Sequence, residues 1–190
     1  MDSLEDRLNQ ILPRITSREL LQNIGLGNEI GFYIFDYPPE KELQVREFLT
    51  FACSQLSKKH PEIRFTLINL FDLIISHLEE RGLLDRAIKL NREKGDQAAL
   101  QALKPPLHPL KIAHFFVQQA NPENQDLILV SGVGSAYPMI RSHSLLQNLH
   151  PLMGNTPLVM FYPGIYSGLD LRLFGRLKQN HYYRAFRLVQ

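Results

Sequence analysis

Short apolar segments that alternate with helical ones are the feature that most limits the folds open to this chain. Segment 126–130, Asp-Leu-Ile-Leu-Val, is almost wholly apolar, and segment 158–161, Leu-Val-Met-Phe, has the same character. Strands of this kind are typical of sheets that are covered on both faces. Because strands separated by helices pair in parallel through right-handed crossovers, the sequence predicts a single three-layer α/β domain over residues 1–190.

About five strands are expected in this mostly parallel sheet, with helices on both faces. Besides the two segments above, strand-like runs occupy residues 32–35, 64–69 and 182–189. The last run alternates in the manner of a strand. We expect it at an edge of the sheet, paired antiparallel with residues 170–177.

The N-terminal segment, residues 1–27, predicts a helical cover packed on the sheet. Its apolar residues keep a spacing of three and four that places them on one helical face. The sequence Thr16-Ser-Arg-Glu19 then has the form of a capping box, in which Thr16 accepts from the third amide and Glu19 reaches back. Gly25 is the expected end of the second helix. The residues on the shared face are Leu4, Leu8, Ile11, Leu12 and Ile15.

Further helices are expected between the strands. They are predicted from Pro38 to His60, from Asp72 to Gly82, from Leu110 to Ala120 and from Met139 to Leu149. The stretch from Leu83 to Leu103 predicts two shorter helical pieces separated by Gly95.

The composition limits the environment and the chemistry. The lone Cys53 excludes an internal disulfide framework and leaves no Cys-x-x-Cys pair for a zinc or redox site. No apolar run approaches the roughly 20 residues needed to span a bilayer. The first ten residues, MDSLEDRLNQ, are acidic and polar, unlike a signal peptide. We therefore expect a cytoplasmic protein without membrane contact.

The formal net charge of +2 hides a skew between the two parts of the chain. Residues 1–126 hold 15 Lys and Arg against 18 Asp and Glu, whereas residues 127–190 hold six against the single acid Asp170. Such an excess either marks one face for an anionic partner or forms a solvated basic edge.

The C-terminal run from Tyr162 to Val189 interleaves arginines with aromatic residues. These residue types contact phosphates and stack on bases, and they are also enriched at protein-interface hot spots. Alternation within a strand would equally place the aromatic side chains in the core. The candidates for partner binding are Arg172, Arg176, Tyr182, Tyr183, Arg184 and Arg187.

A turn of small residues, Ser131-Gly-Val-Gly-Ser135, follows a buried strand and precedes a helix. Ligands of open α/β sheets bind beyond the carboxyl ends of the strands, where such a turn exposes amides to an anion. Tyr137 replaces the third glycine of the dinucleotide fingerprint, and the Gly-Lys-Ser/Thr ending of a P-loop is missing, so a structural turn is favoured. A nucleotide- or DNA-binding module stays open as the alternative. Its contacts would come from Ser131, Gly132, Gly134, Ser135 and Arg141.

The residue pattern indicates no catalytic or metal site. Ser142 and His143 lie in an expected helix rather than on the strained elbow that presents a hydrolase serine. The seven histidines include no His-x-x-x-His pair for a metal ion. We therefore expect no catalytic residues, no metal and no cofactor.

Four stretches resemble the BrxB family of BREX (bacteriophage exclusion) defence systems. The specific ones are the run from Gly132-Val-Gly to Arg141-Ser-His and the run from Phe161-Tyr-Pro-Gly to Tyr182-Tyr-Arg-Ala-Phe-Arg. The other two are Gly31-Phe-Tyr-Ile-Phe-Asp-Tyr37 and Ile68-Asn-Leu-Phe-Asp-Leu73. The resemblance extends from about residue 28 to the C-terminus, with no matching motif between about Leu83 and Ala120.

This resemblance implies a component of a system that marks host DNA by methylation and restricts phage. In such systems the methyltransferase, a large ATPase and an alkaline-phosphatase-like PglZ protein are separate chains. The implied role is a non-enzymatic adaptor that binds PglZ most directly, with other BREX components as further partners. The resemblance carries over no catalytic residue, and direct contact with DNA stays open.

Overall fold

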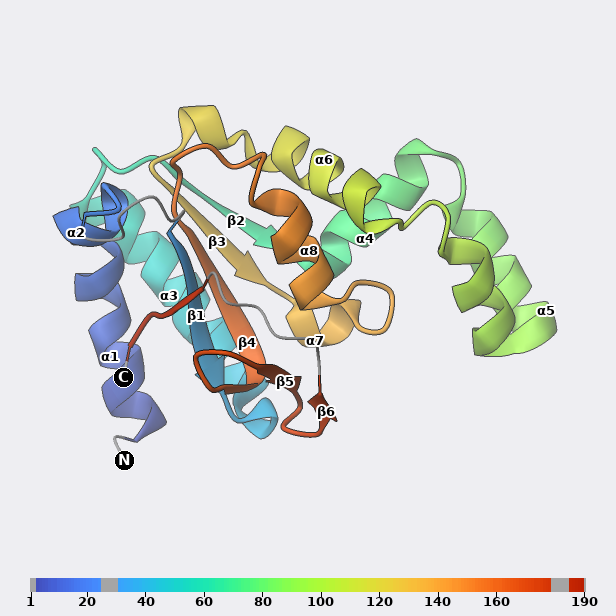
Figure 1. The fold of residues 1–190 in the computed structure, drawn as a ribbon, viewed down its shortest axis with the longest axis horizontal. Helices are drawn as coiled ribbons and strands as arrows, with labels where there is room; N and C mark the ends of the chain where they lie inside the picture. Colours follow the sequence, from blue (N-terminus) through green and yellow to red (C-terminus); the bar gives the residue numbers. More distant parts are fainter. Residues whose placement is uncertain (1–2, 25–30, 179–184, 190) are drawn as a thin grey trace.

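A parallel sheet forms the centre of the computed structural model, which describes residues 3–24, 31–178 and 185–189 (Figure 1). Its main path has the strand order β2-β3-β4-β1-β7, and every neighbouring pair along that path is parallel. The expected sheet of about five mostly parallel strands is therefore confirmed. The strands are β1 (Phe32–Tyr37), β2 (Phe65–Asn69), β3 (Leu127–Ser131), β4 (Leu158–Tyr166) and β7 (Phe186–Arg187).

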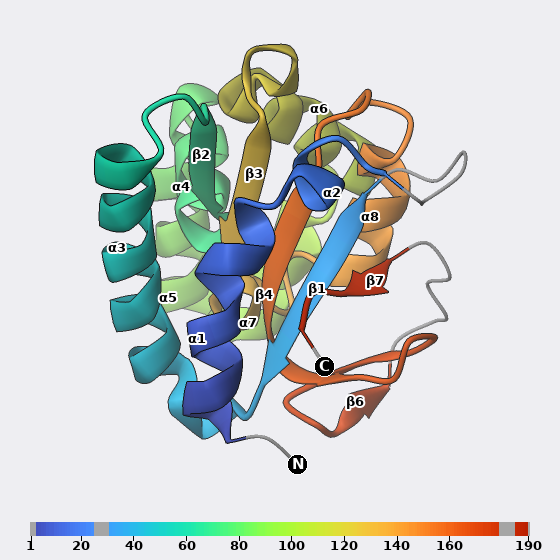
Figure 2. The same cartoon turned by 90° about the vertical axis from the view of Figure 1, so that its left-hand side faces the viewer.

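Helices cover both faces of this sheet, which confirms the expected three layers (Figure 2). One face carries α1 (Leu4–Ile15), α2 (Arg18–Leu21) and, after the short turn Pro39–Lys41, α3 (Glu42–Lys59). The other carries α4 (Leu70–Glu80), α6 (Pro109–Ala120), α7 (Val133–Ala136) and α8 (Ser142–Leu149), with a turn at Pro122–Asn124 before β3. Within the described ranges, no helix is both long and apolar enough to cross a membrane.

The strand side chains alternate between two cores, one on each face of the sheet. In β1, Phe32 and Ile34 join the core under α4, α6 and α8, whereas Tyr33 joins the core under α1 and α3. The four residues Leu127–Val130 of β3 alternate in the same way, and all of them are fully buried. Burial of both faces explains why these strands are continuous apolar runs in the sequence.

The segment after α4 forms α5 (Leu84–Leu103), whose helical geometry is interrupted at Gly95 (φ 81°, ψ 176°). The two helical pieces expected on either side of this glycine are confirmed. α5 extends from one side of the molecule, away from the sheet (Figure 1). Only Ala99 among its residues is buried.

The two predicted N-terminal helices are present, but α2 ends at Leu21, before the predicted end at Gly25, which lies outside the described residues. The predicted cap is wrong by one residue. Ser17 is the N-cap of α2, and its Oγ accepts a hydrogen bond from the Leu20 amide at 3.4 Å. Thr16 instead ends α1, and its hydroxyl donates to the Leu12 carbonyl at 2.9 Å. The cap is displaced because α1 continues through Pro13 to Ile15 and takes Thr16 as its own C-cap.

The C-terminal strand lies at an edge of the sheet, but its predicted pairing is wrong. Residues 186–187 form β7, which pairs in parallel with β1. Residues 171–178 contain β5 (Leu171–Leu173) and β6 (Leu177–Lys178), and β5 pairs antiparallel with β4. β4 runs on to Tyr166, beyond its pairing with β1, and so offers its own edge to β5 first. Residues 182–184 of the predicted strand lie outside the described residues.

A buried carboxylate joins both ends of the chain to the sheet. Asp36 in β1 is 7% exposed, and its Oδ1 accepts from Arg7 Nη2 of α1 at 2.8 Å and from Arg187 Nη1 of β7 at 3.2 Å. Its Oδ2 accepts from the backbone amide of Tyr166 at 2.9 Å. Arg7 also donates to the Asp36 carbonyl at 2.8 Å. Donors to both oxygens compensate for the cost of burying this charge.

A buried histidine lies between α4 and α6. His77 is 2% exposed, its Nε2 donates to the Pro106 carbonyl at 3.0 Å, and its ring packs edge-on against Phe115 with centroids 4.8 Å apart. Burial lowers the pKa of His77 from its ordinary value of 6.5 by more than the hydrogen bond to Pro106 raises it. The fold therefore favours the neutral imidazole.

We expect Asp36→Asn to lower the free energy of unfolding by about 3 kcal/mol, because it leaves two arginines without their shared counter-charge. The loss is at the lower end of the usual range because Arg187 is 37% exposed. Urea unfolding followed by circular dichroism measures it. Asp126→Asn is the control, since it breaks an exposed pair with Arg64. A loss no larger than that of the control would contradict a structural role for Asp36.

The lowered pKa of His77 predicts a pH dependence of stability. The unfolded chain binds this proton more readily than the folded chain, so stability falls as pH drops through about 6.5 and below. We expect the stability difference between the wild type and His77→Gln to shrink between pH 7.5 and pH 5. Urea titrations of both proteins at the two pH values measure this change. If the stability difference between the two proteins is the same at pH 7.5 and pH 5, His77 does not cause the pH dependence.

Candidate functional site

A β-hairpin, formed by β5 and β6 and paired with the end of β4, covers the carboxyl ends of the central strands. In the β4–β5 pair, Gly164 lies opposite Leu173 and Ile165 opposite Arg172. A Cβ on Gly164 would lie 2.2 Å from the Arg172 carbonyl oxygen, so the two backbones meet where no side chain fits. The Phe174 amide donates to the Pro163 carbonyl at 2.9 Å. These contacts fix the hairpin to the end of β4.

Phe174 connects this hairpin to the 131–135 turn. Its ring would lie 3.1 Å from a Cβ on Gly134, and it packs edge-on against Tyr137 with centroids 6.4 Å apart. The neighbouring Ser135 hydroxyl accepts from Arg46 Nη2 of α3 at 3.4 Å. The structure therefore brings together the small-residue turn and part of the arginine–aromatic run, which the sequence treats as separate candidates.

The outer side of the hairpin combines exposed apolar and cationic side chains, and we define it as the hairpin surface. Ile165 is 51% exposed, Leu169 54% and Phe174 38%. Arg172 and Arg176 are exposed, and neither forms an ion pair within the described part of the chain. Ile165 and Arg172 are cross-strand partners, so their side chains share one face. The hairpin surface consists of Ile165, Leu169, Arg172, Phe174 and Arg176.

The other partner-binding candidates of the arginine–aromatic run do not lie on the hairpin surface within the described residues. Arg187 is bound within the chain: it donates to Asp36 and to the Tyr166 carbonyl, and its guanidinium lies 6.0 Å from the centre of the Tyr166 ring. Tyr182, Tyr183 and Arg184 lie outside the described residues. Of the six predicted partner-binding residues, the structure thus places Arg172 and Arg176 together on the hairpin surface.

The 131–135 turn is closely packed. Gly132 has a positive φ of 69°, and a Cβ there would lie 2.1 Å from Asn69 Oδ1. Asn69 is itself occupied as the N-cap of α4, where Oδ1 accepts from the Phe71 amide at 2.9 Å. The helix after the turn, α7, has only four residues. Packing therefore accounts for a glycine at 132, and anion or nucleotide binding at this turn stays a prediction.

Arg141, the fifth candidate for anion binding, lies apart from the turn. It is exposed at the N-terminus of α8 and lines a groove to which none of residues 131–135 contributes. Of the described candidates, Arg172 and Arg176 thus lie on the hairpin surface, Arg141 lines this groove, and Ser131, Gly132, Gly134 and Ser135 belong to the packed turn.

Several other polar groups near the strand ends are engaged or buried. The Tyr37 hydroxyl donates to Glu42 Oε2 at 2.5 Å, and burial together with this bond raises the pKa of Tyr37. Burial raises the pKa of Tyr162, so both phenols stay protonated at neutral pH. Ser142 and His143 begin α8 and are buried. Across the described ranges, no group of three or more His, Cys, Asp or Glu is placed to hold a metal ion.

Sequence reasoning missed the apolar part of the hairpin surface. Ile165 lies in a strand whose other residues are all buried, so alternation alone does not mark it as exposed. Leu169 lies in the loop before β5, where no periodicity applies. A possible signal was Gly164 beside Pro163, because glycine within a strand often marks a close backbone approach.

Comparisons with protein families and with known proteins point to the same family. Residues 66–188 match the family described as BREX protein BrxB. A BREX protein BrxB from Escherichia coli O9:H4 (strain HS) is 45% identical over 98% of this chain and 92% of its own length. A BREX protein BrxB from Bacillus cereus (strain H3081.97) is 41% identical over 100% of this chain and 99% of its own length. No solved structure matches the chain significantly.

We expect Gly164→Ala to destabilise the protein by about 2 kcal/mol, because the added methyl group overlaps the Arg172 backbone. Hydrogen exchange of the Phe174 amide, which donates to the Pro163 carbonyl, should become faster. Urea unfolding and hydrogen exchange measure the two effects. Ile165→Ala is the neighbouring control, since this half-exposed side chain should change stability by less than about 0.5 kcal/mol. Equal effects of the two substitutions would contradict the close approach at Gly164.

Proposed function

The chain belongs to the BrxB family of BREX proteins, and we propose that it is a non-enzymatic adaptor that binds the alkaline-phosphatase-like PglZ component. In this role it acts in the cytoplasm and supports host DNA methylation and phage restriction by holding other BREX chains together. The observation that carries the proposal is the hairpin surface, where exposed Ile165 and Phe174 lie beside Arg172 and Arg176.

The composition of the hairpin surface favours a protein partner. Aromatic and arginine side chains dominate the binding energy of protein interfaces, especially where they are held rigidly. Here Gly164 and the Phe174 amide hold the hairpin against β4, and Phe174 rests on the 131–135 turn. A partner would bury apolar area over Ile165 and Phe174 while its acidic groups pair with the two arginines.

A binding role also agrees with how the strand-end groups are used. In α/β folds these positions supply the groups that bind or transform ligands. In this chain Asp36 is held by Arg7 and Arg187, and Asn69 caps α4. Their hydrogen bonds are directed to the fold, which supports an adaptor rather than an enzyme.

Direct DNA contact is the second candidate, favoured by the same two arginines. Arg172 and Arg176 have no internal counter-charge within the described ranges, and guanidinium groups bind phosphates in a bidentate manner. The two candidates differ in their dependence on salt. Phosphate contacts make affinity fall steeply as salt rises, whereas an interface with an apolar centre changes less.

We expect the double substitution Arg172→Glu and Arg176→Glu to weaken binding to a PglZ-like protein by more than tenfold, because it reverses two charges beside the apolar centre. Co-purification and biolayer interferometry with the purified partner measure the loss. Lys58→Glu with Lys59→Glu is the matched control, since these exposed cations lie at the end of α3, which is away from the hairpin (Figure 2). Thermal unfolding establishes that both variants fold.

Three results would contradict the adaptor proposal. The first is that the wild type binds no BREX component at micromolar concentration. The second is that the hairpin variant binds PglZ as tightly as the control. The third is that duplex DNA binds the wild type with a steep salt dependence and the hairpin variant loses it, which would favour DNA contact. A thermal shift with nucleotides would instead support a ligand at the 131–135 turn.

A further inference from the structure

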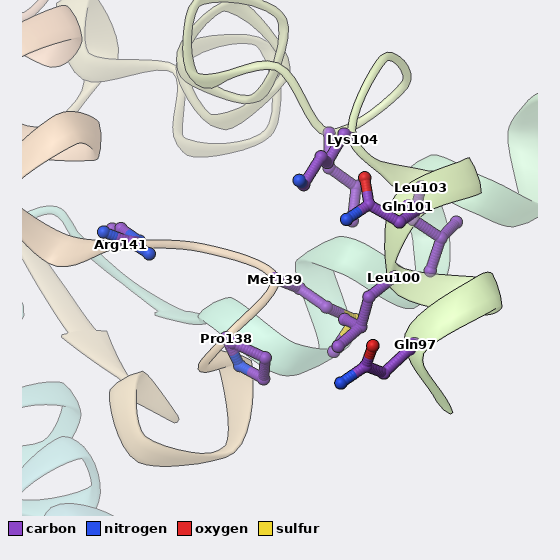
Figure 3. Close-up of a pocket in the computed structure, with 9 residues that line it drawn as sticks. Gln97, Leu100, Gln101, Leu103, Lys104, Pro138, Met139 and Arg141 are labelled. Carbon is purple, nitrogen blue, oxygen red and sulfur yellow. The ribbon is translucent and has the colours of Figure 1, made fainter. Parts of the chain in front are cut away.

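A groove separates the end of α5 from the loop before α8. It consists of two adjoining cavities of about 310 and 330 Å³. Figure 3 shows the side chains from the end of α5 facing Pro138 and Met139 of the loop. We define the α5–α8 groove by the residues that line both cavities, which are Lys104, Leu107, Pro138, Met139 and Arg141.

The groove has apolar walls and a basic, polar rim. Lys104 and Arg141 are exposed at its mouth, with Gln97 and Gln101 on the exposed side of α5. A surface of this kind suits an elongated ligand with apolar side chains on one side and polar groups on the other. The apolar lining includes Leu100, Leu103, Leu107, Ile112, Met139, Ile140 and Leu145.

α5 is poorly supported by its own chain. Most helical stability in proteins comes from packing of an apolar face, yet Ala99 is the one buried residue of this 20-residue helix. Its turns after Gly95 direct Leu100 and Leu103 toward the groove, where both stay partly exposed. A segment lying in the groove would complete the packing of this helix.

The positive charge around the groove favours an acidic ligand. Residues 97–122 and 127–169, which supply every lining side chain, contain no Asp or Glu. Neither Lys104 nor Arg141 forms an ion pair with any residue in the described ranges. Lys111 lies in the first turn of α6, and its Nζ donates to the Pro105 carbonyl. It adds a further positive charge to this region. The basic rim is therefore left to pair with a ligand.

We propose that the α5–α8 groove binds an acidic segment of a partner protein, with apolar side chains in the groove and carboxylates on Lys104 and Arg141. The groove adjoins the hairpin surface through Tyr137, which packs on Phe174 and directly precedes Pro138. It shares no residue with the hairpin surface. The groove proposal therefore goes beyond the adaptor role and does not depend on it.

Site-specific photo-crosslinking tests the groove directly. The full chain carries p-benzoylphenylalanine at Gln101, on the rim, or at Lys58 as a control, and is expressed together with all the other proteins of its BREX system. We expect the Gln101 probe to crosslink to a peptide that mass spectrometry identifies as rich in acids and apolar residues. Adding Lys104→Glu with Arg141→Glu should reduce that crosslink about tenfold. Adding Lys58→Glu with Lys59→Glu to the Gln101 probe should leave it unchanged.

Several outcomes would overturn the groove proposal. They are the absence of a crosslink at Gln101 beyond that at Lys58, a crosslink to nucleic acid or to a second copy of this chain, and a crosslinked segment without excess acid. A crosslink that survives reversal of both charges in a folded protein would overturn it too. A different result would contradict the adaptor proposal, namely that the wild type retains no BREX component. In that case, a charge-dependent crosslink to an acidic segment would still support the groove proposal.

Discussion

The buried carboxylate of Asp36 is the interaction on which the arrangement of this fold depends. It joins α1 through Arg7, the C-terminal strand through Arg187, and the far end of β4 through the Tyr166 amide. The Tyr166 contact lies where β4 leaves the parallel sheet and turns toward β5. Asp36 thereby sets the position of the hairpin. It also pairs with Arg187, whereas Arg172 and Arg176 of the same run are exposed and form no ion pair within the described residues.

The sequence predicts the layers of this fold well because buried strands and helix faces require apolar residues at regular positions. Leu127–Val130 are apolar because both faces of β3 are covered, and Gly95 interrupts α5 as expected. Residues 170–177 were expected to pair as a strand, but their partners were predicted wrongly, because β5 and β6 contain three and two residues, too few for a period. The two arginine partners of Asp36 come from positions 29 and 151 residues away, which no local pattern reveals.

The candidate site shows the same division between local and long-range information. The arginine–aromatic run and the 131–135 turn were both recognisable in the sequence, but only the fold shows that Phe174 rests on Gly134. Alternation could not distinguish Arg187, which pairs within the chain, from Arg172, which faces outward. The fold also locates part of the basic excess of residues 127–190, because Arg141 lines the groove while Arg172 and Arg176 lie on the hairpin surface.

Hydrogen exchange of the full chain, alone and with a purified PglZ-like protein, tests most directly the claim that the hairpin surface is the adaptor's interface. Backbone amides of residues 164–176 should exchange more slowly in the complex, while those on the exposed side of α3 stay unchanged. Protection confined to α1 and α3, with the exchange of residues 164–176 unaltered, would contradict the claim.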